Sequence, residues 1–288
     1  MNIEYHYYIT YLIAVVSGFK MSEAYKIAYS SQHVDDNYLE YDIYNSNGKS
    51  KDSYKNLASG IDIKEIFATF DEKIKKILVI FHLLPGDGVN NREDGKEHAL
   101  TTTKDSKLAN MVLKEALNSK NLYWIGIATH AYADSWAHQN FVGTLSDFNA
   151  FPDGALSPNL GHCDAFDKPD LVGLIWEDPR LKRKKVNNVD KFLSKLREIM
   201  MNDEKNSYFD VKRLEHDRIK KYNDLAKQFT SFDILRYDKN KWYNETIKST
   251  AGGKLFWKNE GYKNYDWYQF QEAVKLHYNF VTSKLLPN

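Results

Sequence analysis

Apolar side chains recur every three or four positions along most of this 288-residue chain, a spacing that predicts amphipathic helices rather than strands. The spacing predicts helices over 3–17, 22–31, 62–82, 105–119, 121–142, 186–202, 210–230, 238–249 and 265–285. Polar stretches at 38–60, 85–103 and 143–169 are predicted loops, and no alternating pattern indicates a strand. We therefore expect an all-α protein with a single domain over 1–288.

The helix predicted over 121–142 carries the clearest chemical signal. It places His130, Asp134 and His138 at i, i+4 and i+8, so their side chains stack along one face that also carries apolar residues. A buried carboxylate without a partner costs several kcal/mol, and one divalent cation bound by all three side chains removes that cost. A hydrogen-bonded His-Asp-His ladder that only orders the core is the structural alternative. We favour the metal site.

Other histidines and aspartates among the first 170 residues extend this set. The candidate ligands outside the central helix are His6, Asp35, Asp36, His82, His162 and Asp164, with Asp167 as an alternative to Asp164. Mixed imidazole and carboxylate sets suit Zn²⁺, Mn²⁺ or Fe²⁺ better than Mg²⁺ or Ca²⁺. We expect two or three ions, most simply zinc, and neighbouring ions of this kind are typical of enzymes that hydrolyse phosphate esters. The segment 171–288 is a predicted helical extension.

Several of these residues have structural alternatives. Asp35 and Asp36, followed by Asn37, also form a good helix exit, and a neutral His82 near a helix C-terminus is a common capping residue. Cys163 beside His162 is a possible thiolate ligand or nucleophile, but no cationic neighbour in the sequence lowers its pKa. We therefore prefer His162 to Cys163 as the ligand.

Composition limits the partners. The chain has 40 basic and 39 acidic residues, so its overall charge predicts no general attraction to nucleic acid or to an acidic membrane. The single cysteine excludes an intrachain disulfide framework. The apolar run at 7–16 has no Lys or Arg before it and is too short to span a bilayer. We expect it to be the first helix of a cytoplasmic protein without a membrane span, and the sequence leaves the oligomeric state open.

Three phrases carry a resemblance to known families. Glu4-Tyr-His-Tyr-Tyr-Ile-Thr-Tyr-Leu, Gln32-His-Val-Asp-Asp and His130-Ala-Tyr-Ala-Asp-Ser-Trp-Ala-His-Gln-Asn-Phe-Val-Gly resemble an uncharacterised bacterial family with a domain of unknown function, DUF6765. The order of histidines and aspartates over about 1–200 also resembles the zinc-dependent phospholipase C and P1/S1 nuclease superfamily, which are all-α enzymes with a trinuclear zinc cluster. By order, the resemblance implies the ligands His6, one of Asp35 and Asp36, His82, His130, Asp134, His138, and His162 with Asp164. It also implies that the early aspartate, Asp35 or Asp36, is the general base.

The chain departs from the superfamily pattern at three points. It begins with Met1 rather than the Trp whose terminal amine and carbonyl bind metal in the secreted enzymes. His138 follows Asp134 by four positions rather than six, and neither Asp164 nor Asp167 has the usual spacing from His162. The resemblance is therefore as compatible with two ions as with three.

Three functions from different classes fit these features. The first is a metal-dependent phosphodiesterase or phosphatase that acts on a nucleotide, nucleic acid or phospholipid head group. The second is an HD-type nucleotide phosphohydrolase, which is disfavoured because none of the candidate histidine ligands is directly followed by an aspartate. The third is a non-catalytic, metal-stabilised interaction module of a bacterial defence or toxin system. No P-loop, dinucleotide-binding turn or Gly-x-Ser-x-Gly elbow is present.

Overall fold

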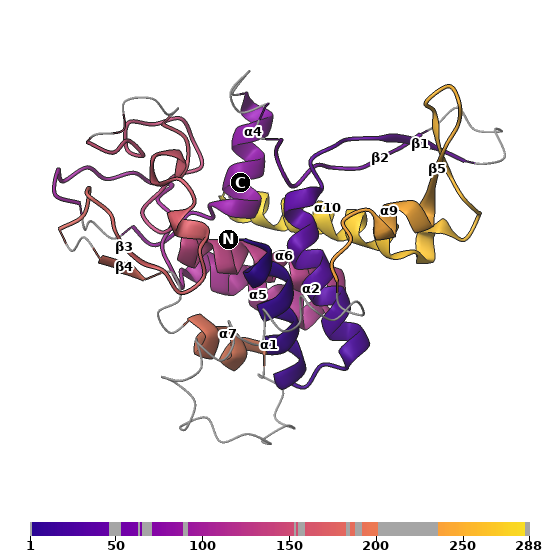
Figure 1. Cartoon of the computed structure of the whole chain (residues 1–288), viewed down its shortest axis with the longest axis horizontal. Coiled ribbons are helices and arrows are strands. Elements are labelled where there is room, and N and C mark those ends of the chain that lie inside the picture. The colour runs from indigo at the N-terminus through magenta and orange to yellow at the C-terminus, as the bar shows by residue number, and fades with distance from the viewer. Residues whose placement is uncertain are drawn as a thin grey trace.

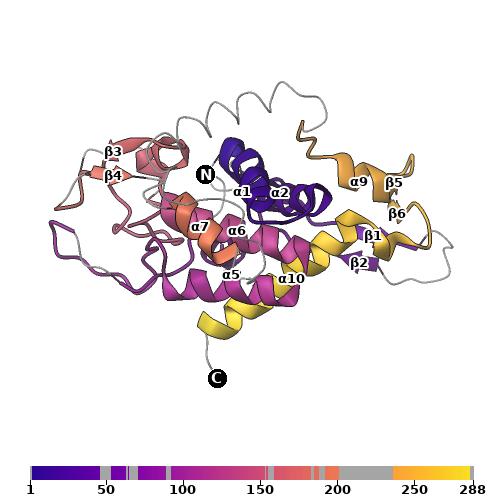
Figure 2. The same cartoon turned by 90° about the horizontal axis from the view of Figure 1, so that it is seen from below.

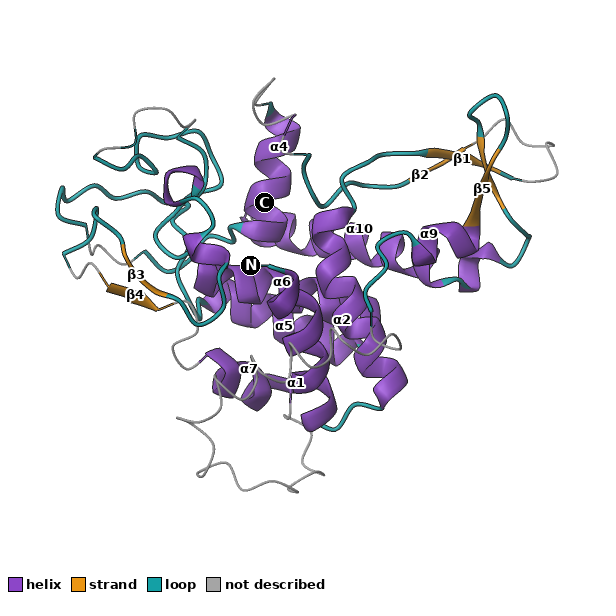
Figure 3. Ribbon diagram, in the orientation of Figure 1, coloured by secondary structure: helices purple, strands orange, loops and turns teal. Residues whose placement is uncertain are grey.

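The computed structural model describes residues 2–45, 53–62, 64, 71–88, 92–152, 154, 159–182, 185–187, 192–200 and 236–285. Its α-helices are α1 Thr10–Val16, α2 Met21–Asp36, α4 Glu72–Ile77, α5 Lys107–Ser119, α6 Leu122–Ala137, α7 Phe192–Met200, α9 Lys241–Thr246 and α10 Asp266–Leu285 (Figure 3). Two π-helices cover Glu4–Ile9 and Leu78–His82, and short 3₁₀ turns cover Cys163–Ala165, Lys168–Asp170 and Tyr262–Asn264. Within the described residues, no helix combines the length and apolarity needed to cross a membrane.

Helix α6 is the centre of the molecule. It packs against α2, α5 and α10, and every residue from Trp124 to Ala137 is buried (Figure 2). The side chain of Asn121 caps it by accepting hydrogen bonds from the backbone N–H groups of Tyr123 and Trp124. A helix that is buried on all sides needs apolar or paired side chains all round, and this helix has them.

Gly126 allows α6 to approach α2 closely. A Cβ atom at this position would lie 2.3 Å from the carbonyl oxygen of Ile27 and 2.5 Å from Cβ of Ser30. Only glycine fits such a contact. One turn further along α6, the close approach lets His130 reach the backbone of Ser31.

The C-terminal helix α10 packs on the same core as the N-terminal helices. It lies against α6, α5 and the π-helix Leu78–His82, and it buries Phe270, Val274 and Val281. The segment predicted as a helical extension therefore contributes core residues to the part of the fold that carries the candidate ligands.

Two small sheets make the prediction of an all-α protein wrong in part, although a mostly helical fold is confirmed. Strands β1 Asp42–Tyr44, β2 Ser53–Lys55, β5 Ile247–Ser249 and β6 Leu255–Trp257 form one sheet in the order β2-β1-β6-β5, in which only the β1–β6 pair is parallel (Figure 1). Strands β3 Ile175–Glu177 and β4 Lys185–Asn187 form an antiparallel pair. Each strand has three residues, too few to show an alternating pattern.

Several predicted boundaries also change. Helix α2 continues past 31 to Asp36, which brings both early aspartates onto a helix. The ranges predicted as helices over 186–202 and 238–249 each contain a strand beside a shorter helix, namely β4 with α7 and α9 with β5. The helix predicted over 210–230, and residues 65–70 of the one predicted over 62–82, lie outside the described residues.

A second, smaller core supports the loops that follow α6. It contains Leu83, Phe141, Ala165, Trp176, Leu181 and Val186. Beside it, Arg180 forms two hydrogen bonds of 2.6 and 2.9 Å with the fully buried carboxylate of Asp178, and its guanidinium lies 3.9 Å from the ring centroid of Phe141. Arg180 also donates to the carbonyl oxygens of Phe148 and Asn149. One buried cation therefore joins three parts of the loop region.

We expect Arg180→Met to lower the free energy of unfolding by about 3–5 kcal/mol, because it leaves the charge of Asp178 buried without its partner. Lys195→Met is the control. It removes a partly exposed ion pair with Glu198 on α7 and should cost at most about 1 kcal/mol. Urea denaturation followed by circular dichroism measures both. Equal losses for the two variants would contradict the structural role given to Arg180.

Candidate metal centre

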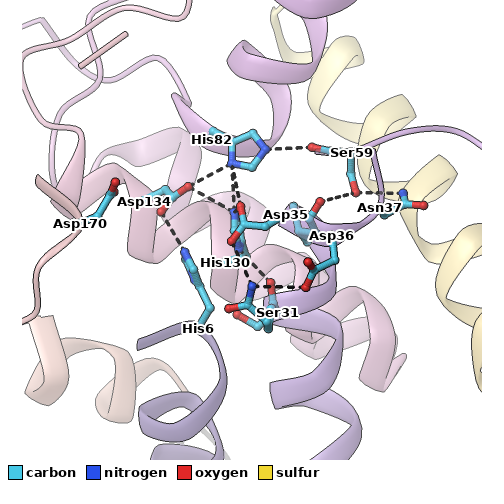
Figure 4. A network of polar contacts seen from close by, with 12 residues as sticks. His6, Ser31, Asp35, Asp36, Asn37, Ser59, His82, His130, Asp134 and Asp170 are labelled. Atoms are coloured by element: carbon cyan, nitrogen blue, oxygen red, sulfur yellow. Dashed lines mark hydrogen bonds and ion pairs between the residues drawn. The ribbon is translucent and has the colours of Figure 1, made fainter. Parts of the chain in front are cut away.

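Five side chains from four segments converge at the middle of α6, and we call them the central cluster: His6, Asp35, His82, His130 and Asp134 (Figure 4). His130 and Asp134 come from α6, and Asp35 comes from the last turn of α2. His6 and His82 lie on the two π-helices. A π-helical turn shifts the register of the side chains that follow it, and such turns are frequent at functional sites.

The backbone fixes which ring nitrogen of two histidines faces the cluster. The Nδ1–H group of His130 donates to the carbonyl oxygen of Ser31 at 2.8 Å, and the Nε2–H group of His82 donates to that of Ser59 at 2.8 Å. A neutral imidazole has one N–H, so the opposite nitrogens, Nε2 of His130 and Nδ1 of His82, both present lone pairs. These two nitrogens lie 3.1 Å apart. Two lone pairs at this distance need a positive charge between them.

Two carboxylate oxygens complete the arrangement. Oδ2 of Asp134 lies 3.2 Å from each of the two nitrogens, and Oδ1 of Asp35 lies 3.7 Å from each. Ligand atoms bound at about 2.0–2.1 Å to a tetrahedral zinc lie about 3.3–3.4 Å from one another. The five observed separations lie on both sides of this value. Asp35, His82 and His130 form one set of three candidate ligands, and His6, His130 and Asp134 form a second. The histidine–carbonyl hydrogen bonds are the supporting contacts that metal-binding histidines normally make.

Asp134 also faces a further histidine with its other oxygen. Oδ1 lies 3.2 Å from Nε2 of His6, whose ring stacks on that of His130 with centroids 3.8 Å apart. His6 is fully buried, and neither of its ring nitrogens has a hydrogen-bond partner among the described residues. Burial and the neighbouring His130 hold the pKa of His6 well below its usual range, so the ring is neutral and able to bind a metal. Asp134 can therefore bridge two ions, one through each oxygen.

Three other residues form what we call the outer cluster: His138, His162 and Asp170. The Nδ1–H groups of His138 and His162 donate to the carbonyl oxygens of His82 and Phe166, at 3.0 and 2.9 Å. Their Nε2 atoms lie 3.0 and 3.6 Å from the two oxygens of Asp170. The two rings are stacked at 4.6 Å, so this cluster repeats the pattern of the central one.

Both clusters open onto one pocket of about 330 Å³. Its lining residues are Asp35, Ile61, Leu78, His82, Leu83, Asp134, His138, Leu160, Gly161, His162, Cys163 and Asp170. Nδ1 of His138 lies 3.8 Å from Oδ2 of Asp134, which puts the two clusters in direct contact. Ions held by both would therefore be neighbours in a single cavity.

The charges of the two clusters depend on each other. Burial raises the pKa of Asp134, but the positive charge of the chain's amino terminus and then the imidazoles of His138, His130 and His6 outweigh it, and the net pKa lies well below the usual range. Burial lowers the pKa of His82, yet its hydrogen bond to Asp134 and the charge of Asp35 raise it overall. The ionised carboxylates thus demand positive charge, which either protons or metal ions can supply.

Two of the nine ligands predicted from the sequence lie outside these clusters. Asp36 belongs to neither cluster, and its carboxylate accepts a hydrogen bond of 2.7 Å from the hydroxyl of Tyr237. The amide of Gln32 lies 3.5 Å from an oxygen of each of the two aspartates, but it is Asp35 whose carboxylate lies 3.7 Å from His82 and His130. The carboxylate of Asp164 accepts a hydrogen bond of 2.7 Å from the backbone N–H of Phe151 and holds a loop. The other seven predicted residues come together.

Asp170 is the carboxylate that the sequence interpretation missed. It follows His162 by eight positions, with two 3₁₀ turns between them, and no regular spacing signals a shared site across such a segment. The only available clue is its place at the end of a polar loop that already contains a candidate histidine. The hydrogen bonds from the histidines to the carbonyl oxygens of Ser31 and Ser59 could not be predicted either, because every residue type has a backbone carbonyl.

Comparison with known proteins gives one match. Residues 1–285 match the model of the Family of unknown function (DUF6765). The chain belongs to this family. No curated protein and no solved structure matches the chain. The relation of this DUF6765 protein to zinc-dependent phospholipase C and P1/S1 nucleases stays a prediction.

The adjacent pair Asp35 and Asp36 offers a test of the central cluster in this DUF6765 protein. We expect Asp35→Asn to weaken zinc binding by about 100-fold or more, because it removes the only carboxylate from the set that Asp35 forms with His82 and His130. Asp36→Asn, one position away, should bind zinc as the wild type does. Isothermal titration calorimetry on metal-free protein measures both affinities. Equal affinities for the two variants would contradict the assignment.

A second matched pair of variants, at Asp170 and Asp164, tests the outer cluster. Asp170→Asn should reduce the number of tightly bound ions by one, because His138 and His162 alone supply two ligands. Asp164→Asn should keep the wild-type number, since its carboxylate bonds to the backbone of Phe151. Inductively coupled plasma mass spectrometry of dialysed protein gives the ion count per chain. Loss of an ion from the Asp164 variant alone would identify Asp164, and not Asp170, as the ligand.

Proposed function

We propose that this protein is a metal-dependent phosphoesterase with a di- or trinuclear centre of the zinc type. The observation that carries the proposal is the pair of contacting ligand clusters at the wall of one pocket. Ions a few ångströms apart are most often used to hydrolyse phosphate esters, and Mn²⁺ or Fe²⁺ also fit these ligands. The order of the ligands along the chain, which resembles that of zinc-dependent phospholipase C and P1/S1 nucleases, supports the same class.

The two clusters differ in a way that favours catalysis over a purely structural role. The central cluster offers two overlapping sets of three ligands, and its His6 and His130 are fully buried. The outer cluster offers three side chains and borders the pocket, so an ion there keeps a position for water or substrate. An interaction module would need only the buried ligands. The open site is the feature a hydrolase requires.

Bound ions would supply a hydroxide at neutral pH and positive charge for the phosphoryl oxygens. The residues of the chain would position the two clusters and supply the general base. Asp134 holds both clusters in register through its two oxygens. We assign the role of general base to Asp35 rather than Asp36, since Asp35 lines the pocket and partial burial raises its pKa.

The rest of the pocket bears on the substrate. The pocket is also lined by the apolar side chains of Ile61, Leu78, Leu83 and Leu160, and no Lys or Arg is among the described lining residues. In this part of the chain the charge of a phosphate would therefore be balanced by the ions themselves. Nucleotides, nucleic acid and phospholipid head groups are the substrate classes that we propose to test.

An HD-type phosphohydrolase is the weaker alternative. Such enzymes use an adjacent His-Asp pair, and the adjacent pair in this chain, His216-Asp217, lies outside the described residues. The two clusters are built without it. No contact in the described part of the chain favours this class over the first.

We expect the zinc- or manganese-loaded protein to hydrolyse bis-p-nitrophenyl phosphate or p-nitrophenyl phosphate. Asp134→Ala should lose bound metal together with at least about 100-fold in kcat/KM, because both clusters depend on this carboxylate. Release of nitrophenolate and elemental analysis of the same samples measure the two effects. A fully loaded wild-type protein without activity on a panel of nucleotides, nucleic acids and phospholipids would refute the enzyme while leaving the metal site intact.

A further inference from the structure

His277 is a buried histidine on α10 that belongs to neither ligand cluster. It is fully buried, and its Nε2–H group donates a hydrogen bond of 3.1 Å to the carbonyl oxygen of Ile80. Its ring lies on that of Phe81, with centroids 5.1 Å apart and planes within 20°. It thus joins the C-terminal helix to the π-helix Leu78–His82, which carries a central-cluster histidine at its last position.

The carbonyl of Ile80 needs a donor from outside its own helix. The last carbonyls of any helix lack intrahelical partners, and the Leu78–His82 helix ends with the N–H of Leu83 bonded to the carbonyl oxygen of Leu78. The residue five positions after Ile80 is Pro85, which has no N–H to continue this pattern. A buried carbonyl without a partner is costly. His277 supplies the missing donor two residues before His82.

A histidine at this position leaves one buried ring nitrogen without a hydrogen bond among the described residues. That nitrogen is Nδ1 of His277, whose ring is completely buried. Burial lowers the pKa of His277 to about 4, so the ring is neutral and its one N–H lies on Nε2. A phenylalanine would stack on Phe81 without an unsatisfied nitrogen. What the histidine adds is the hydrogen bond to Ile80.

We propose that His277 is a positioning residue for the central cluster, which fixes the end of the Leu78–His82 helix so that His82 faces Asp134 and His130. The inference rests on the proposed metal centre. His82 depends on this support because its two ring contacts point in different directions, Nε2 to the carbonyl of Ser59 and Nδ1 into the cluster. A small rotation of the helix end breaks one of them. Contacts that orient a ligand typically change metal affinity by about 10–100-fold.

Two substitutions of similar shape test the proposal. Glutamine at 277 places an amide N–H near the position of Nε2, whereas methionine fills the same space without a donor. We expect His277→Met to weaken binding at the central cluster by about 10–100-fold and to keep the outer ion, and we expect His277→Gln to retain most of the affinity. Val281→Ala, one turn further along α10, is the control for a destabilised core: it should lower the melting temperature and leave metal affinity unchanged.

Titration of the metal-free proteins with Co²⁺, followed by its visible absorption bands, reports affinity and ligand geometry together. Circular dichroism first establishes that each variant is folded. If His277→Met does not fold, His277→Phe, which keeps the stacking on Phe81, takes its place. Wild-type affinity and spectrum in the donor-free variant would overturn the proposal, as would a glutamine variant that binds as weakly as methionine. A wild-type protein that binds no Co²⁺ or Zn²⁺ would overturn the metal centre itself, so the two failures are distinguishable.

Discussion

The buried carboxylate of Asp134 is the constraint on which the rest of the structure depends. Its side chain is 1% exposed, and it lies in the last turn of α6, a helix in which every residue from Trp124 to Ala137 is buried. A carboxylate in such a place must be matched by positive charge or by donors from every side. His6 and His82 approach it from the two π-helices and His130 and His138 from α6 itself, so three segments of the chain are arranged around one charge.

The backbone shares in this arrangement. Four of the histidines, His82, His130, His138 and His162, use one ring nitrogen to bond a carbonyl oxygen and turn the other towards a carboxylate. Three of these carbonyls, those of Ser59, His82 and Phe166, lie in loops or at a helix end, where such groups have no intrahelical partner. The same hydrogen bonds that satisfy the backbone therefore select the tautomer of each ring. The close packing of α2 on α6 at Gly126 makes the hydrogen bond between His130 and the carbonyl oxygen of Ser31 possible.

The sequence predicted the parts of this site that follow helical periodicity. His130, Asp134 and His138 share a face because 3.6 residues complete a turn, and their burial follows from the apolar residues around them. Asp170 was missed because the irregular loop between it and His162 has no period. Asp36 and Asp164 were included because side-chain chemistry alone cannot tell a ligand from a carboxylate that bonds to Tyr237 or to the backbone. The strands were not predicted for a similar reason. Strand β1 pairs with β6, more than two hundred positions away, and a sequence pattern reports only local order.

The two clusters rest on different kinds of support, and this difference has a consequence for their chemistry. The central cluster is held by packed helices, with α10 closing it from the C-terminal side, so its geometry changes only if the main core changes. The outer cluster takes two of its three residues from loops, which Arg180 and the small core around Phe141 hold in place. A loop-borne site can adjust to an incoming ligand at lower cost than a site built on packed helices. Under the proposed function, an ion at the central cluster would be held rigidly, and an ion at the outer cluster would be held by loops that can adjust to a substrate.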